Sequence, residues 1–125
     1  GWVVPRTVAR PDTLAGVDLR PGDTVLLSPY LTHRLPEFWP DPYAFRPERF
    51  AAGREAGRHR FAYFPFGGGP HQCLGNHFAM REAELAVAGL LSRFRPEVVR
   101  PQSLEARVAV VLQPRQRPRL RLHPR

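Results

Sequence analysis

Cysteine, lysine and isoleucine are the residues that this sequence lacks or nearly lacks. Its 125 residues include one cysteine, so an internal disulfide is excluded, which fits a reducing compartment. All nineteen lysine and arginine positions are arginine, and isoleucine is absent, a bias typical of a GC-rich coding sequence. No apolar run is long enough to cross a membrane, and no signal-peptide pattern opens the chain. These absences predict a cytoplasmic protein without a membrane segment in this chain.

Proline, in contrast, is abundant. Fifteen prolines are too many for a simple helical bundle, while a hydrophobic content of 42% is compatible with one domain and a modest core. The sequence opens at Gly1 inside a strand-like pattern, so we expect it to be a piece of a longer protein.

Positive charge is concentrated near the C-terminus. The net charge is +8, and residues 93–125 carry nine arginines against Glu97 and Glu105, a net charge of +7. This tail has no interleaved aromatic residues and no recognised nucleic-acid motif, so we expect a solvated surface and no nucleic-acid partner. A small basic module that binds nucleic acid or a protein partner remains the alternative function.

The first half of the chain alternates turn signals with short extended segments. Strands are expected at residues 2–4, 7–9, 17–19 and 24–28, which would form a small antiparallel sheet. A short helix is expected at 29–35. The stretch 36–50 should be an irregular coil pinned by ring packing, with Phe38, Trp39, Tyr43, Phe45 and Phe50. The polar stretch 51–60 is expected to be an exposed loop.

The second half is predicted to hold one long helix followed by strands. From Gly75 to Phe94 the pattern is helical, and from Leu85 onward it is apolar on nearly every side, which is typical of a buried helix. Strands are then expected at residues 98–99, 107–112 and 119–123.

A glycine-rich loop containing the cysteine joins these halves. The sequence Phe64-Pro-Phe-Gly-Gly-Gly-Pro-His-Gln-Cys-Leu-Gly-Asn-His77 places three glycines before Cys73. Glycine permits positive φ and a close backbone approach, and the start of the following helix favours an anionic sulfur. The loop therefore suits a thiolate that binds a metal, with the loop backbone lying close against a large flat ligand.

Two other interpretations of the loop stay open at this point. His71, Cys73 and His77 could be three ligands of a zinc site, although paired Cys-x-x-Cys or His-x-x-x-His arms are missing. Alternatively, Cys73 could be a lone buried cysteine beside a turn.

The spacing Phe66-x-x-Gly69-x-x-x-Cys73-x-Gly75 resembles the haem-binding signature of the cytochrome P450 monooxygenases. The phrase Gly-Val-Asp-Leu-Arg-Pro-Gly-Asp-Thr-Val and the stretch from Trp39 to Phe50 resemble two further segments of that family, the second being its meander.

This resemblance implies a mixed α+β fold, the C-terminal part of the mostly α cytochrome P450 fold, with small antiparallel sheet segments and one long buried helix. Residues 1–125 would be a single partial domain. Its parts would be the small sheet at 1–28, the short helix and proline-rich meander at 29–63, the haem-binding loop at 64–75, the helix at 76–94 and the terminal strands at 95–125.

The resemblance also implies the cofactor and its ligands. The cofactor would be haem b, iron protoporphyrin IX, with Cys73 as the catalytic axial thiolate on the iron. Arg6 and His71 would pair with haem propionates. The remaining cofactor-binding residues would be Phe66, Gly67, Gly69 and Gly75.

The implied activity is insertion of one oxygen atom from dioxygen into an apolar organic substrate, with electrons from a ferredoxin or flavoprotein. Arg54, Arg58, Arg60 and Arg81 are candidates for steering that electron donor. Arg49 would lack the Glu-x-x-Arg partners of the family and should be unpaired or solvated. The isolated chain is expected to bind haem weakly and to be an inactive fragment.

Overall fold

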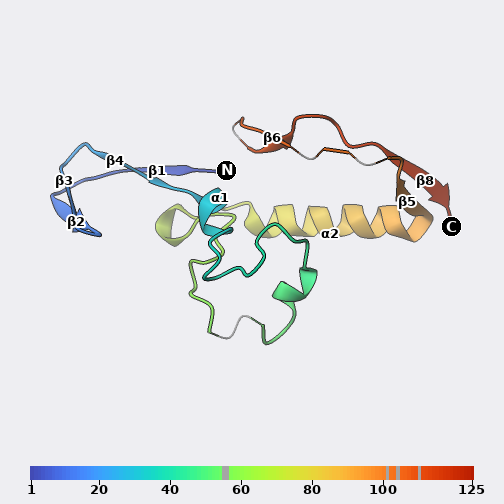
Figure 1. Ribbon diagram of the computed structural model, residues 1–125, viewed down its shortest axis with the longest axis horizontal. Coiled ribbons are helices and arrows are strands. Elements are labelled where there is room, and N and C mark those ends of the chain that lie inside the picture. The colour runs from blue at the N-terminus through green and yellow to red at the C-terminus, as the bar shows by residue number, and fades with distance from the viewer. Residues whose placement is uncertain (55–56, 101, 104, 110) are drawn as a thin grey trace. The chain divides into compact units, whose positions relative to one another are not determined.

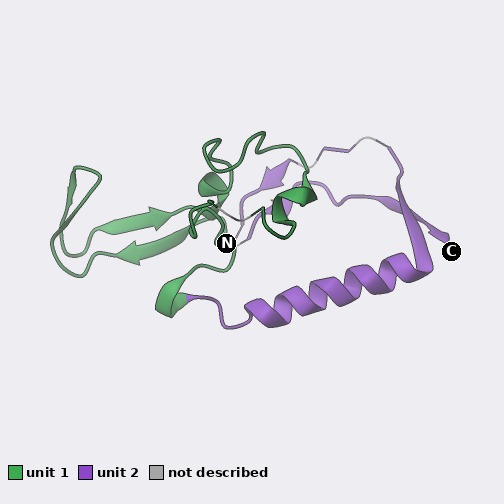
Figure 2. Ribbon diagram, turned by 90° about the horizontal axis from the view of Figure 1, so that it is seen from below, with its two compact units in different colours: residues 1–71 green, residues 72–125 purple. Residues whose placement is uncertain are grey.

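The computed structural model describes residues 1–54, 57–100, 102–103, 105–109 and 111–125 (Figure 1). These residues form two compact units, residues 1–71 and residues 72–125 (Figure 2). Each unit is described by itself below.

The first unit begins with two antiparallel strand pairs. Strand β1 (Val4–Thr7) pairs with β4 (Thr24–Leu27), and β2 (Asp12–Leu14) pairs with β3 (Val17–Leu19). Ala15 and Gly16 join β2 to β3 with φ values of 50° and 81°, as a tight two-residue hairpin turn requires. The predicted antiparallel pairing is confirmed.

The predicted strands at residues 2–4 and 7–9 are wrong in their bounds. The structure has one strand, β1, which runs through Pro5 and Arg6 between them. Pro5 interrupts the apolar pattern and was therefore interpreted as a break. It is accommodated because β1 pairs with β4 on one side only, and an edge strand can place the missing N–H on its free side.

Helix α1 (Pro29–Thr32) follows, and the chain then turns into a coil that contains the 3₁₀ turn η1 (Pro47–Phe50). The Ser28 side chain accepts a hydrogen bond from the Leu31 N–H and caps the helix. The predicted helix at 29–35 is thus real but shorter.

Trp39 forms the centre of the coil. It is 4% exposed, and its indole N–H donates to the Ala62 carbonyl oxygen at 3.1 Å. The Phe50 and Tyr63 rings each lie 5.8 Å from the Trp39 ring, centroid to centroid. The predicted ring packing is confirmed for Trp39 and Phe50. It is wrong for Tyr43 and Phe45, which are exposed.

The second unit consists of one long helix and two strand pairs. Helix α2 (Asn76–Arg93) leads into β5 (Phe94–Val98), which pairs antiparallel with β8 (Leu120–Pro124). Strand β6 (Ala106–Arg107) pairs with β7 (Gln113–Pro114). The predicted strand at 98–99 starts earlier, at Phe94. Of the predicted strand at 107–112, the described residues form a strand only at Arg107, where β6 ends, and residue 110 lies outside the described residues.

Helix α2 has the predicted length but not the predicted burial. No residue of α2 is buried in this chain, and Leu85 is 73% exposed. The pattern shows that the helix is apolar all round, whereas burial depends on other surfaces to cover it. No helix in the described part of the chain is long and apolar enough to cross a membrane.

Candidate functional site

A largely apolar hollow of about 460 Å³ lies in the first unit. It is bordered by strands β1 and β4, helix α1 and the glycine-rich loop. Its lining residues are Val4, Arg6, Leu27, Thr32, Phe61, Phe64, Gly67, Gly68 and Gly69. A hollow of this volume and character suits a small organic ligand.

Three successive glycines form one wall of this hollow. Gly67 and Gly69 have φ values of 76° and 69°, in the left-handed region that side chains disfavour. At Gly68 an added Cβ would lie 3.0 Å from Cε1 of Phe61. The loop therefore needs glycine for its backbone conformation at two positions and for space at the third.

Arg6 is the charged residue of the hollow. It is half-buried on β1, and one guanidinium nitrogen donates to the Pro5 carbonyl oxygen at 2.9 Å. It forms no ion pair with a carboxylate in the described part of the chain. Its remaining donors can therefore bind an anionic group of a ligand in the hollow.

Cys73 lies three residues before helix α2 and has a free, exposed thiol. An added Cβ at Gly75 would lie 3.8 Å from its Sγ, an ordinary contact distance. The alternative of a lone buried cysteine is not supported, because the thiol is exposed and open to a ligand.

His71 and His77 are both exposed. Within the described residues, no three His, Cys, Asp or Glu side chains gather as they would around a metal ion. The donor set is a single sulfur, which does not fit a zinc site with several protein ligands.

His33 is a residue of this region whose role sequence reasoning missed. Its Nε2 accepts a hydrogen bond from the Phe64 N–H at 2.9 Å, where the glycine-rich loop begins. The ring lies 4.7 Å from Tyr63, centroid to centroid. Burial, with a smaller effect of the Arg34 charge, lowers the pKa of His33 and favours the neutral acceptor. His33 therefore helps to position the start of the glycine-rich loop.

Arg49 does not behave as predicted. Its guanidinium group donates to the carbonyl oxygens of Pro40, Asp41 and Ala44 at 2.5, 2.7 and 3.4 Å. The expectation of an unpaired or solvated side chain is wrong, because it considered only carboxylate partners. Arg49 therefore links three backbone positions of the coil through hydrogen bonds to their carbonyl oxygens.

The arginines proposed for partner steering differ in their surroundings. The Arg58 guanidinium lies 4.2 Å from the centre of the Trp39 ring and donates to the Arg49 carbonyl oxygen at 3.3 Å. That of Arg60 lies 4.4 Å from the Phe61 ring, and Arg81 pairs with Glu84 at 2.8 Å. Arg58 therefore has a structural role in the coil.

Comparison with known proteins identifies a single family. The family model described as "Cytochrome P450" matches residues 2–121. Cytochrome P450 136 of Mycobacterium tuberculosis is 46% identical over 101 residues, and cyclooctatin synthase of Streptomyces melanosporofaciens is 42% identical over 94 residues. These matches cover 80% and 75% of this chain but 20% of each relative.

Solved structures show the same relation. A cyanobacterial CYP120A1 bound to retinoic acid matches with a TM-score of 0.88 and 33% identity, covering 96% of this chain and 28% of that chain. The haem domain of cytochrome P450DA matches with a TM-score of 0.87 and 29% identity, over 95% of this chain and 26% of that one. The chain thus spans about a fifth to a quarter of the proteins it resembles.

Proposed function

Because the chain belongs to the cytochrome P450 family, we propose that the whole protein is a haem-thiolate monooxygenase in which this chain supplies the proximal haem-binding part. The observation that carries the proposal is the loop around Cys73. It combines an exposed thiol with glycines at 67 and 69 in left-handed conformations. The role proposed for each residue follows from its place in this loop or beside the hollow of the first unit.

Cys73 is the residue proposed to ligate the haem iron as a thiolate. Its sulfur is free and exposed, three residues before the start of α2, and is therefore open to a metal ion. Phe66 is proposed to shelter the sulfur from water in the whole protein, and Gly75 carries no side chain beside it. A single protein sulfur fits a porphyrin, because the four nitrogens of the ring would themselves hold the iron.

Arg6 and His71 are proposed to bind the haem propionates. Arg6 is a cation beside an apolar hollow, which suits a ligand with an apolar body and a carboxylate. His71 ends the 3₁₀ turn η2 (Gly69–His71), two residues before Cys73. Gly67 and Gly69 let the backbone pass close to a flat ring because neither carries a side chain.

Thiolate-ligated haem b, when bound, supplies the activation of dioxygen. One oxygen atom enters an apolar organic substrate and the other becomes water, which requires two electrons and two protons. The electrons would come from a ferredoxin or a flavoprotein. Arg54, Arg60 and Arg81 remain proposed as steering residues. Arg58 does not, because it both packs on the Trp39 ring and donates to the Arg49 carbonyl oxygen, which ties it to the coil.

Oxygen labelling tests this activity. The protein produced from the complete gene would be supplied with haem, an electron donor, ¹⁸O₂ and a panel of terpenoid, fatty-acid and polyketide substrates. The proposal predicts product with one ¹⁸O atom per turnover, and product formation that depends on the electron donor. Product that carries oxygen from water, or none from dioxygen although haem is bound, would contradict it.

A further inference from the structure

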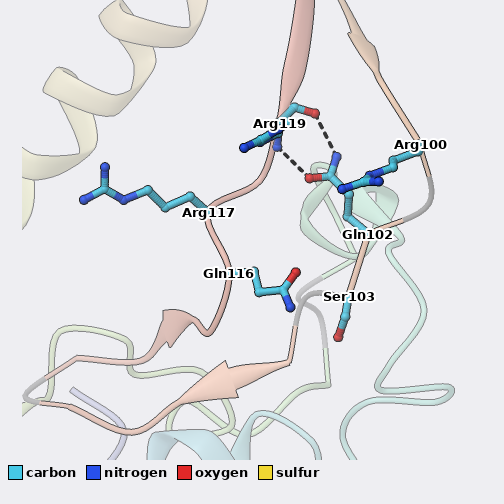
Figure 3. A pocket seen from close by; sticks show the side chains of 6 residues that line it. All are labelled: Arg100, Gln102, Ser103, Gln116, Arg117 and Arg119. Atoms are coloured by element: carbon cyan, nitrogen blue, oxygen red, sulfur yellow. Dashed lines mark hydrogen bonds between the residues drawn. The ribbon is translucent and has the colours of Figure 1, made fainter.

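A second hollow, of about 490 Å³, lies in the second unit (Figure 3). Half of its lining comes from the segment after β5 and half from the segment before β8. The six lining residues are Arg100, Gln102, Ser103, Gln116, Arg117 and Arg119. None of them has a part in the proposed haem chemistry.

Gln102 holds the two segments together. Its Oε1 accepts a hydrogen bond from the Arg119 N–H at 2.6 Å, and its Nε2 donates to the Arg119 carbonyl oxygen at 2.7 Å (Figure 3). This side-chain amide therefore extends the β5–β8 pairing beyond its last pair, Val98 and Leu120. The two backbone segments that line the hollow are therefore held together by hydrogen bonds.

The charge of the lining is positive and uncompensated. Three of the six residues are arginine and none is acidic. The guanidinium groups of Arg100, Arg117 and Arg119 form no ion pair or hydrogen bond with any described residue. Figure 3 shows Arg100 and Arg119 beside Gln102, while Arg117 extends away from them.

Positive guanidinium groups that line one hollow repel one another, and a multivalent anion bound there would offset that repulsion. Guanidinium forks also match the oxygens of phosphate groups in bidentate pairs. Ser103 and Gln116 add a hydroxyl and an amide donor at the same hollow. The lining can thus supply many hydrogen-bond donors to one ligand.

The same lining restricts the ligand class. Its six described lining residues are all polar or charged, and none of these six has an aromatic side chain on which a nucleobase could stack. A compact, highly charged ligand is therefore favoured over a nucleic acid or an apolar one.

We propose that this hollow binds a short polyphosphate, either free or as the phosphate tail of a nucleotide, with Arg100 and Arg119 as its main ligands. The site is separate from the haem chemistry in residues and in ligand. Its failure would leave the monooxygenase proposal untouched.

Titration calorimetry of the protein produced from the complete gene tests the site. At about 150 mM salt, where distant charges are screened, tripolyphosphate should bind saturably, pyrophosphate more weakly and orthophosphate most weakly. Arg100→Gln and Arg119→Gln should each weaken tripolyphosphate binding about tenfold, since each removes charge-assisted hydrogen bonds. The absence of saturable binding would overturn the proposal.

Arg121→Gln is the matched control. Arg121 lies on β8 outside the lining, and its loss changes the net charge by the same amount. It should change affinity less than twofold, whereas a loss equal to that of Arg100→Gln would indicate diffuse attraction and overturn the site. Circular dichroism checks whether Arg119→Gln disturbs the β5–β8 pairing. If it does, Arg100→Gln decides the test, because the Arg100 guanidinium has no partner among the described residues.

ATP distinguishes the two sources of phosphate. Binding of ATP within about tenfold of tripolyphosphate supports recognition of a nucleotide's tail, and markedly weaker binding supports a free polyphosphate. Binding of ATP more than about tenfold tighter would require contacts to the base and would overturn the assignment to phosphate alone.

Discussion

Trp39 in the first unit and Leu85 in the second are both large apolar side chains, yet Trp39 is 4% exposed and Leu85 is 73% exposed. Trp39 lies in irregular coil and Leu85 in a regular helix. Burial in this chain therefore does not follow regular secondary structure.

The two regions differ in where their packing partners lie along the chain. Phe50, Tyr63 and Arg58 surround Trp39, and all lie within 24 residues of it in sequence. From Leu85 onward helix α2 is apolar on nearly every side, yet none of its residues is buried. The coil thus forms its own small core, whereas the described part of the second unit does not cover the helix.

The largest expected effect is at Trp39. In the protein produced from the complete gene, Trp39→Ala should lower the free energy of unfolding by about 3–5 kcal/mol, because it empties a packed site and leaves the Ala62 carbonyl oxygen without its donor. Urea denaturation measures this. Phe45→Ala, at a ring that is 94% exposed, should cost less than about 0.5 kcal/mol. Equal losses for the two variants would contradict a core centred on Trp39.

Leu85→Ala tests whether α2 is covered in the whole protein. If it is, the variant should lower the free energy of unfolding of the complete protein by about 2–4 kcal/mol, as burial of a leucine predicts. Glu82→Ala, one turn earlier on the polar edge, serves as the control and should cost less than about 0.5 kcal/mol. A cost for Leu85→Ala as small as that of the control would show that the helix stays exposed.

Arg49→Lys tests the closure of the coil by hydrogen bonds. Lysine keeps the charge but cannot present the planar fork that reaches three carbonyl oxygens, so we expect a loss of about 2 kcal/mol in the free energy of unfolding. Arg54→Lys, in the exposed loop, should change it by less than about 0.5 kcal/mol. An Arg49→Lys variant as stable as the parent protein would show that charge alone matters.

The smallest expected effect is a pH dependence at His33. Its folded pKa is lowered below the ordinary value of 6.5, so the unfolded chain binds the proton more readily. The stability from neutral His33 is full above pH 6.5 and is lost as the pH falls through the lower folded pKa. We expect the free energy of unfolding to decline over this range, because protonation of His33 also removes the acceptor of the hydrogen bond from the Phe64 N–H.

His33→Gln provides the comparison for this pH dependence, since glutamine can accept the same hydrogen bond and does not titrate. Urea denaturation at pH values from 7.5 to about 5 should show a smaller decline for the variant. Parallel curves for the two proteins would exclude His33 as the titrating group.

The sequence predicted those parts of the fold that have local signals. Helix α2 was located within one residue at each end, and β3 was located at its exact bounds, whereas its partner β2 was not predicted. The exposure of α2 could not be predicted, because periodicity reports which faces are apolar and not what covers them. Pro5 misled the assignment of β1 because a proline is tolerated on an edge strand.

The candidate site likewise has parts with a local sequence signal and parts without one. The spacing around Cys73 was sufficient to locate the loop, because its glycines and cysteine lie within a few residues. The bond from His33 to Phe64 was missed since it joins residues 31 apart, and no spacing rule connects them. The surroundings of Arg49 were predicted wrongly because its partners are backbone carbonyl oxygens, which every residue has and which no sequence pattern reveals.

The most direct test of Cys73 is the absorption spectrum of the reduced, carbon-monoxide-bound protein. We would compare the haem-loaded product of the complete gene with Cys73→Ser and with His77→Gln. A strongly red-shifted Soret band that is retained in His77→Gln and lost in Cys73→Ser is predicted, because only a thiolate ligand produces that shift. A band that persists in Cys73→Ser would contradict the assignment of Cys73 as the ligand of the haem iron.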